Sequence, residues 1–308
     1  RARLKGHIVN RFRGDPALFD DALPLIAQRT GMPSLGVVPW LDATRDLPAE
    51  DTASLGSRYV AGDWGRAPVR IAVPRLARIA NFDDLDPLAA EPDVALRLVE
   101  PGESLPGDAN LILLAGSKST RTDMDELRRN GWVEEIRVAA EGGAHVFGLC
   151  GGYQMLGRTI SDPSGTEGPA GTTPGLGLLD VETRIAVEKT LSPAAGRTAA
   201  EDIHVTGFEM HMGETAGPDT QRPFLALDGG RPDGATDGTG RIAGTYLHGL
   251  FGTDAFRAAF LRRIDCRASA TIEWNHRVDV ALDRLADHMD VHLDTRRILE
   301  IAHERGKE

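Results

Sequence analysis

The chain has 308 residues, of which 41% are hydrophobic and 26% are charged, and its formal net charge is -11 at pH 7. This length predicts roughly two domains of about 150 residues each, and the negative charge argues against a nucleic-acid partner. Cys150 and Cys266 are the only cysteines, so we expect no disulfide framework and a reducing, cytoplasmic compartment. No apolar run approaches the ~20 residues of a membrane span, so no membrane partner is expected.

The first sixty residues predict a short β-α-β unit. Residues 6–10 favour a strand, residues 15–30 carry an apolar stripe of helical period, and residues 35–39 favour a second strand. Such a unit is typical of a parallel sheet, but too few strands are present here to complete one. We therefore interpret residues 1–62 as the C-terminal remnant of an α/β domain, followed by a Gly/Pro-containing linker at 63–68.

Residues 69–265 predict a doubly wound α/β domain. Strands are expected at 69–73, 94–99, 109–114 and 144–149, with helical segments between them, and shorter strands at 178–187, 203–212 and 241–246. In such a sheet the ligand crevice lies at the carboxyl ends of the strands, where Gly116 and Cys150 both fall.

The last segment, 266–308, has a helical pattern. Its apolar stripe runs through Val278, Leu282, Leu285 and Met289. We expect this segment to form a helical cap on the preceding domain.

The stretch around Cys150 is typical of a nucleophile elbow. An apolar run ends on the cysteine, two glycines follow, and a helix-compatible segment begins. The first N–H groups of that helix favour a thiolate, and the N–H of Gly151 is placed to stabilise an oxyanion. A buried core cysteine is the alternative, which the glycines on both sides disfavour.

A cysteine nucleophile needs a base, and His248 is the best candidate. It ends a predicted strand in a turn of small residues, although sequence separation alone does not distinguish it from the other histidines. Gly116 and Ser117 end another strand in a loop that lacks the glycine required directly before the lysine of a phosphate loop. A second oxyanion donor suits this loop better, with an ordinary turn as the alternative.

Two further pairs of polar residues have a spacing that is compatible with a site. His288 and His292 have a metal-like i, i+4 spacing, but no third ligand is evident, so a solvated helix face is favoured and no metal site is predicted. Glu209 and His211 share one face of a predicted strand, where a binding role and a polar solvent face are equally compatible. Cys266, beside charged residues and without a glycine turn, is predicted to be inert.

Seven stretches together resemble the cobyric acid synthase family, the glutamine-hydrolysing amidotransferases of cobalamin synthesis. They follow the family's order over nearly the whole chain, at residues 8–15, 35–39, 80–88, 116–120, 148–157, 207–213 and 246–251. The Cys-Gly-Gly-Tyr-Gln run by itself indicates only the wider class of cysteine amidotransferases. The Asn-Phe-Asp-Asp-Leu-Asp-Pro-Leu run makes the resemblance much more specific.

The resemblance implies a two-domain enzyme. A domain similar to dethiobiotin synthetase uses ATP and Mg2+ to activate carboxylates of adenosylcobyrinic acid a,c-diamide. A flavodoxin-like glutamine amidotransferase domain, which is expected to bind no cofactor, supplies ammonia from glutamine. The main ATP-binding loop is not found in this sequence, so the chain is expected to carry the glutaminase half, preceded by the tail of the synthetase domain.

Site residues follow from the resemblance by position. It implies that Cys150 is the nucleophile, that His248 is its base, and that Gly151, Gly116 and Ser117 form the oxyanion site. The residues implied to hold glutamine are Gln154, Gly152, Glu209 and His211, and those implied to contact a nucleotide are Asn10 and Pro39. Leu250 stands where triad amidotransferases carry an acid, so a Cys–His dyad is expected.

Other functions remain open from the sequence. Cobyrinic acid a,c-diamide synthase and a lipid II-amidating glutaminase share the elbow and the fold. A truncated, catalytically silent docking module is the non-enzymatic alternative, and a thiol-trapping glutamine analogue would distinguish it.

Overall fold

The computed structural model describes residues 4–47 and 60–304. The chain divides into two compact units, residues 1–48 together with 275–308, and residues 49–274. Residues 1–3, 48–59 and 305–308, which fall in the first and last segments expected from the sequence, lie outside the described residues. Within the described part of the chain, no helix combines the length and apolar character needed to cross a membrane.

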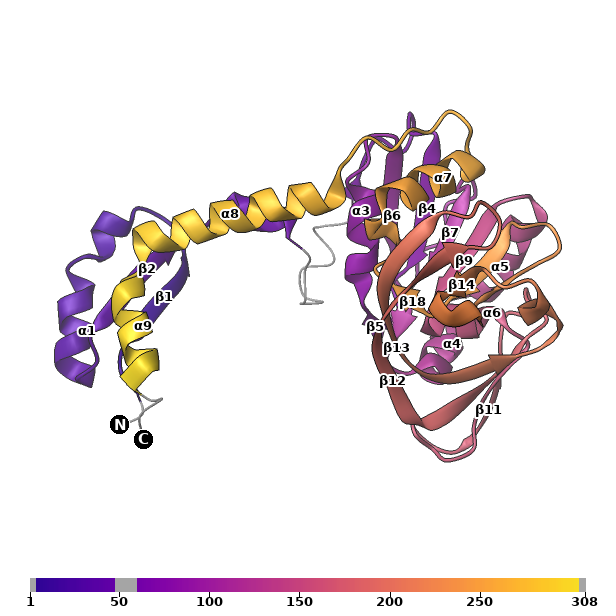
Figure 1. Cartoon of the computed structure of the whole chain (residues 1–308), viewed down its shortest axis with the longest axis horizontal. Helices are drawn as coiled ribbons and strands as arrows, with labels where there is room; N and C mark the ends of the chain where they lie inside the picture. The colour runs from indigo at the N-terminus through magenta and orange to yellow at the C-terminus, as the bar shows by residue number, and fades with distance from the viewer. Residues whose placement is uncertain (1–3, 48–59, 305–308) are drawn as a thin grey trace. The chain divides into compact units, whose positions relative to one another are not determined.

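The described part of the larger unit is built on a seven-stranded sheet of order β16-β17-β9-β7-β4-β6-β3 (Figure 1). The five inner strands are parallel. The strand bounds are β3 (Val60–Ala61), β4 (Val69–Pro74), β6 (Val94–Val99), β7 (Leu111–Leu114), β9 (His145–Leu149), β16 (Ala235–Thr236) and β17 (Ile242–Thr245). The chain adds β6 on one side of β4 and then β7, β9 and β17 on the other, which confirms the predicted doubly wound order.

Helices connect and cover these parallel strands, as the right-handed crossovers of a doubly wound sheet require. Their bounds are η4 (Phe82–Leu85), α3 (Asp86–Ala89), α4 (Thr120–Arg129), α5 (Trp132–Glu141), α6 (Gly151–Leu156), η7 (Leu250–Gly252) and α7 (Asp254–Ile264). Apolar clusters fill both faces of the sheet, and β9 alternates between them. Phe147 and Leu149 join one cluster, while Val146 and Cys150 join the other.

A second sheet, mostly antiparallel, follows the elbow with the order β11-β10-β12-β13-β18. Its long hairpin of β12 and β13 is plain in Figure 1. The bounds are β10 (Thr159–Asp162), β11 (Gly171–Pro174), β12 (Glu182–Thr198), β13 (His204–Ala216), β14 (Leu225–Leu227), β15 (Arg231–Asp233) and β18 (Leu247–His248), with η5 (Pro218–Gln221) and η6 (Asp228–Gly230) between strands. A short separate pair, β5 (Ile79–Ala80) with β8 (Gly116–Ser117), lies beside the elbow.

The smaller unit contains the β-α-β unit predicted at the start of the chain. Strands β1 and β2 pair in parallel. The bounds are β1 (His7–Phe12), η1 (Pro16–Phe19), α1 (Ala22–Thr30), β2 (Ser34–Pro39), η2 (Asp42–Asp46), α8 (Trp274–His292) and α9 (Thr295–Glu304). Helix α1 ends at Gly31, whose φ of 72° is the left-handed conformation that glycine adopts without strain.

The C-terminal segment contacts the smaller unit. The segment between α8 and α9 is tied to β2 by main-chain contacts: Asp294 N donates to Leu35 O at 2.8 Å, and Leu293 forms a bridge with Gly36. Contact clustering accordingly groups residues 275–308 with residues 1–48. A helical period predicts an apolar face but not the element that the face meets.

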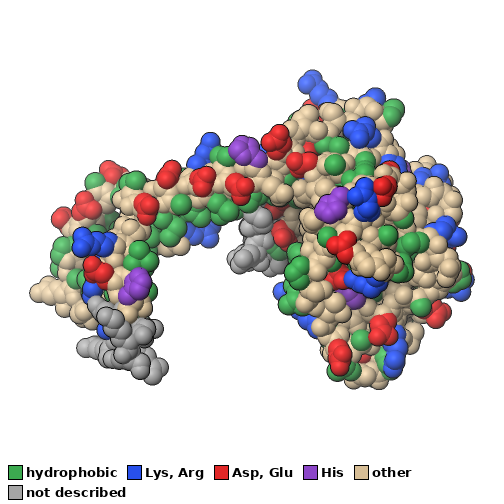
Figure 2. Space-filling view, in the orientation of Figure 1, with side chains coloured by type: hydrophobic (Ala, Val, Ile, Leu, Met, Phe, Trp, Pro, Cys, Tyr) green, Lys and Arg blue, Asp and Glu red, His purple; other side chains and the backbone are tan. Residues whose placement is uncertain are grey.

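The predicted apolar stripe of α8 also differs from the observed one. Leu282 and Met289 have exposed fractions of 48% and 40%, whereas Ala281 is 2% exposed. Figure 2 shows acidic and apolar side chains on different flanks of this helix. The buried face is therefore rotated away from Leu282 and Met289.

The predicted linker at 63–68 is part of the larger unit. Trp64 Nε1 donates to Asp108 Oδ1 at 3.0 Å, and Ala67 is buried. The preceding strand β3 pairs with β6 in the central sheet. Glycine and proline here make a packed turn that leads into β4.

Candidate active site

Cys150 occupies the turn between β9 and α6. Its φ of 50° and ψ of -108° place a non-glycine residue in a strained backbone region, which is typical of nucleophile elbows. Its N–H donates to Thr245 O at 2.9 Å. A Cβ on Gly152 would overlap the carbonyl group of Leu114, so glycine is required for α6 to approach β7. The thiol is mostly buried, and its Sγ donates to Met210 O at 3.4 Å.

His248 reaches the elbow from the neighbouring strand. β17 runs parallel to β9, and the chain continues into β18, which pairs with β13 so that His248 lies opposite Phe208. The imidazole is fully buried and stacks on the Phe208 ring at 5.3 Å between centroids. Cys150 is close enough to raise the pKa of the ring. The structure therefore joins the two residues that the sequence predicted as nucleophile and base.

Asp84 supplies a carboxylate partner for His248 that was not predicted from the sequence. Its Oδ2 lies 2.7 Å from His248 Nδ1, and its Oδ1 accepts from Gly249 N at 2.6 Å. The expectation of a Cys–His dyad is therefore wrong, because a carboxylate also contacts the histidine. Leu250, two residues after the histidine, is a fully buried core residue, while the acid comes from η4, 164 residues before the histidine.

These contacts change the protonation of His248. Burial alone lowers the pKa of a histidine, but hydrogen bonds to Asp84 and Cys150, together with the charges of both, raise the pKa of His248 to about 10. At neutral pH the ring is therefore an imidazolium, with Nδ1–H directed at Asp84. An imidazolium beside a thiol stabilises the thiolate.

The Gly116–Ser117 strand and Gly151 meet at the same place. A Cβ built on Gly151 would lie 2.8 Å from Ser117 N, and one on Gly116 would lie 3.3 Å from His248 Cε1. Two main-chain segments with N–H groups thus converge beside the thiol. The arrangement suits an oxyanion site, in which fixed main-chain N–H groups stabilise the developing negative charge.

Asp123 holds the Gly116–Ser117 loop in place by hydrogen bonds. Its fully buried carboxylate accepts from Ser117 Oγ at 2.6 Å and from Arg78 N at 3.2 Å, so it ties β8 to the residue before β5. Burial raises the pKa of Asp123 to about 6, although the bonds from Ser117 and Arg78 act in the opposite direction.

Wild-type protein is expected to lose stability as the pH rises and the buried Asp123 carboxyl group ionises. Replacing Asp123 with asparagine should remove this loss. The folded pKa of about 6 exceeds the unfolded value of 3.8. The carboxyl group therefore contributes its full stability below pH 3.8 and loses it as the pH rises through about 6. The free energy of unfolding of Asp123→Asn relative to wild type should rise by up to about 3 kcal/mol between pH 4 and 7. Urea unfolding at several pH values measures this difference, and a pH-independent difference would contradict the assignment.

Gln154, on the helix that follows Cys150, belongs to a buried polar network. Its Oε1 accepts from Thr120 Oγ1 at 2.8 Å, and its Nε2 donates to Tyr246 OH at 3.3 Å. The Tyr246 hydroxyl group also lies 2.6 Å from Thr215 Oγ1. Both ends of the amide are therefore engaged within the protein, and the side chain links α6 to β13 and to the residue between β17 and β18.

Glu209 and His211 do not form a solvated strand face, so that alternative is wrong. Glu209 is 2% exposed, and its Oε1 accepts from Arg231 Nη1 at 3.0 Å. His211 stacks on Tyr246 with 3.9 Å between ring centroids. Burial lowers the pKa of His211, against the raising effects of Gly213 O and Glu209, so the ring is neutral at physiological pH.

Comparisons with known proteins identify the family of this chain. A family model described as the CobB/CobQ-like glutamine amidotransferase domain matches residues 70–256. The chain belongs to this amidotransferase family. Among solved structures, PurLQS from Thermotoga maritima is 18% identical, with a TM-score of 0.44 over 70% of this chain and 99% of that one. A chain described as a glutamine amidotransferase is 17% identical, with a TM-score of 0.46 over 63% and 97%.

The resemblance to cobyric acid synthases is confirmed. The cobyric acid synthase of Paracoccus denitrificans is 52% identical over 301 residues, which cover 98% of this chain and 61% of that protein. That of Methylocella silvestris is 48% identical and covers 98% and 62%. The chain thus spans about three fifths of the length of these relatives.

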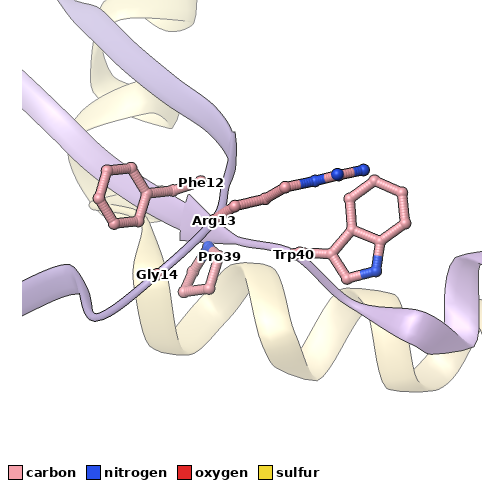
Figure 3. A pocket seen from close by; sticks show the side chains of 5 residues that line it. All are labelled: Phe12, Arg13, Gly14, Pro39 and Trp40. Carbon is pink, nitrogen blue, oxygen red and sulfur yellow. The ribbon is translucent and has the colours of Figure 1, made fainter.

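A separate pocket lies in the smaller unit, at the carboxyl ends of β1 and β2 (Figure 3). It measures about 420 Å³ and is lined by Phe12, Arg13, Gly14, Pro39 and Trp40. The Arg13 guanidinium lies 4.7 Å from the centroid of the Trp40 ring. Pro39 therefore belongs to this pocket, whereas the Asn10 side chain bonds to the next main-chain N–H instead.

The paired histidines of α8 have other partners. His288 Nε2 lies 3.0 Å from Pro39 O, and the His288 ring lies 4.5 Å from that of His292, so the pair is half-buried rather than solvated. In residues 4–47 and 60–304, no group of three or more His, Cys, Asp or Glu side chains is arranged to hold a metal ion. Cys266 is exposed.

Sequence reasoning missed Asp84 and Asn81, whose side chains contact opposite nitrogens of the His248 ring. The run that contains them predicts a capped helical turn and carries the family resemblance, but neither property points at His248. One feature of the sequence could have indicated that Asp84 has a partner. It is an aspartate in a stretch that otherwise packs into the core, and buried carboxylates are usually paired.

Proposed function

We propose that this chain is the glutamine-hydrolysing part of a cobyric acid synthase. The observation that carries the proposal is the Cys150–His248–Asp84 arrangement on a strained elbow beside two converging main-chain segments. The identity to cobyric acid synthases supports the choice among the amidotransferases of this fold.

The first half of the reaction forms a thioester. The Cys150 thiolate attacks the amide carbon of glutamine, and the carbonyl oxygen becomes an oxyanion that N–H groups of Gly151 and of the Gly116–Ser117 loop stabilise. Each such donor is worth roughly 10²–10³ in rate. The His248 imidazolium then gives its proton to the leaving nitrogen, and ammonia departs as the carbon–nitrogen bond breaks.

The second half hydrolyses the thioester. His248, now neutral, takes a proton from water as the water oxygen attacks the thioester carbon. Glutamate leaves, and the thiolate and imidazolium are restored. Asp84 holds Nδ1–H throughout, so that Nε2 is the nitrogen that exchanges protons.

Four groups are proposed to bind or surround glutamine: Glu209, His211, Gln154 and Gly152. Glu209 and His211 flank Met210, whose carbonyl group contacts Cys150. Gln154 acts by holding α6 in place, because its amide is already engaged. His211, neutral and close to Tyr246, is the alternative base if His248 is excluded.

In the whole enzyme, the ammonia would amidate side-chain carboxylates of adenosylcobyrinic acid a,c-diamide in a reaction that uses ATP and Mg2+. We assign the smaller unit to the tail of the dethiobiotin-synthetase-like domain that catalyses this step. The pocket at Trp40 fits a nucleotide base, because it combines an aromatic ring, apolar walls and the Arg13 guanidinium group at the ends of parallel strands. Pro39 would line the base, and Asn10 would shape the adjoining turn.

The test is treatment of the protein with 6-diazo-5-oxo-L-norleucine, an electrophilic glutamine analogue. We expect one adduct, on Cys150, protection by glutamine, and release of ammonia and glutamate in equal amounts from glutamine itself. Cys266 serves as an internal control, since it is exposed and lies outside the site. Absence of both the adduct and ammonia release would contradict the proposal and favour a docking module.

A further inference from the structure

Asn81 touches the nitrogen of His248 that exchanges protons in the proposed reaction. Its Nδ2 lies 3.0 Å from Nε2, while Asp84 Oδ2 lies 2.7 Å from Nδ1. The two side chains stand three residues apart on one 3-10 turn, in which Asp84 N donates to Asn81 O at 3.2 Å. Asn81 directly precedes η4 and Asp84 lies within it, so this turn brings both polar groups to one ring.

The position of Asn81 is fixed by its neighbours. Its φ of 49° and ψ of 42° are left-handed, a conformation that asparagine tolerates better than most residues. Before it, Ala80 pairs with Gly116 of the proposed oxyanion loop. After it, Phe82 is 4% exposed in the core. The same short segment therefore sets the oxyanion loop, Asn81 and Asp84 in register.

Building on the glutaminase function, we propose that Asn81 is a positioning residue whose Nδ2–H donates to Nε2 of His248 while the ring is neutral. The imidazolium directs its Nε2–H toward the Cys150 sulfur or the leaving nitrogen, whereas the neutral ring bonded to Asp84 has an Nε2 lone pair that needs a donor. The carboxamide of Asn81 supplies that donor. Asn81 thus holds the neutral ring in place between the loss of its proton and the uptake of the next one.

Several charged groups act on the His248 ring. Asp84 and Cys150 act directly on His248, and the charge of Asp83, on the same turn, also acts on it; Phe208 covers the ring face. Because the pKa of His248 is raised to about 10, the imidazolium predominates at neutral pH. Asn81 Nδ2 lies 3.0 Å from Nε2, so it is placed to donate once the ring has given up its proton.

Two substitutions test this without straining the turn. Asn81→Asp keeps the shape but leaves only an acceptor, which favours the imidazolium and opposes the neutral ring needed for thioester hydrolysis. We expect kcat to fall by on the order of 10–100-fold, with a glutamyl thioester on Cys150 detectable by mass spectrometry. Asn81→Gly removes the side chain and suits a positive φ. We expect kcat to fall while KM for glutamine is unchanged, and the pH optimum of kcat/KM to move.

Asp83→Asn is the matched control, because it alters the charge on the same turn without contacting Nε2. It should shift the pH profile in the direction opposite to Asn81→Asp and build up no thioester. A raised KM with normal kcat in Asn81→Gly would mean that Asn81 binds glutamine, and no thioester in Asn81→Asp would also overturn the inference. Wild-type protein that releases no ammonia would instead refute the glutaminase function itself.

Discussion

Replacing Cys150 with serine is expected to lower glutamine hydrolysis by on the order of 10⁴-fold or more. A serine hydroxyl group does not ionise beside an imidazolium as a thiol does. Ammonia release from glutamine measures the effect. Cys266→Ser is the matched control, since that cysteine is exposed and far from the elbow in sequence, and it should retain wild-type activity.

The same change at the corresponding cysteine of a full-length cobyric acid synthase separates the two halves of the reaction. Amidation driven by glutamine should be lost, whereas amidation driven by added ammonia should persist, because the synthetase site is untouched. If both activities fell together, Cys150 would be a structural residue and the elbow would have no catalytic role.

Asp84→Asn is expected to lower glutamine hydrolysis by roughly 10²–10⁴-fold, the usual worth of an acid–base group held in the correct tautomer. Asparagine offers no negative charge to Nδ1–H, so the pKa of His248 falls and the thiolate loses its cationic partner. The pH profile of Cys150 alkylation by iodoacetamide should therefore move to higher pH. Asp83→Asn, on the same turn, should change the rate far less.

The same substitution has a pH signature in stability. The folded pKa of His248, about 10, exceeds its unfolded value of 6.5. The ion pair with Asp84 therefore contributes its full stability below pH 6.5 and loses it as the pH rises through about 10. Asp84→Asn should be most destabilising at pH 6 and progressively less so toward pH 10, as urea unfolding would report. Two results together would contradict a role for Asp84 in the site. They are a pH profile of Cys150 alkylation that Asp84→Asn leaves unchanged, and a destabilisation by Asp84→Asn that does not depend on pH.

The sequence by itself determined the local features of this protein. The strand ending at Cys150 and the glycines after it predict the elbow, because a positive φ and close helix–strand approach depend on neighbouring residues only. The strands of the doubly wound sheet were also predictable, since residues buried on both faces form short apolar runs such as Leu111–Leu114. His248 could be named as a candidate but not distinguished from other histidines by its own neighbours.

Only the tertiary structure decided which residues meet. The partner of His248 is Asp84 rather than a residue after the histidine, because parallel strands bring distant segments to one sheet edge and the sequence carries no mark of that pairing. The same reason explains why the segment between α8 and α9 pairs with β2, which lies far from it in the sequence. Amphipathic periodicity specifies that a helix buries one face, and the partner of that face is chosen by the folded chain.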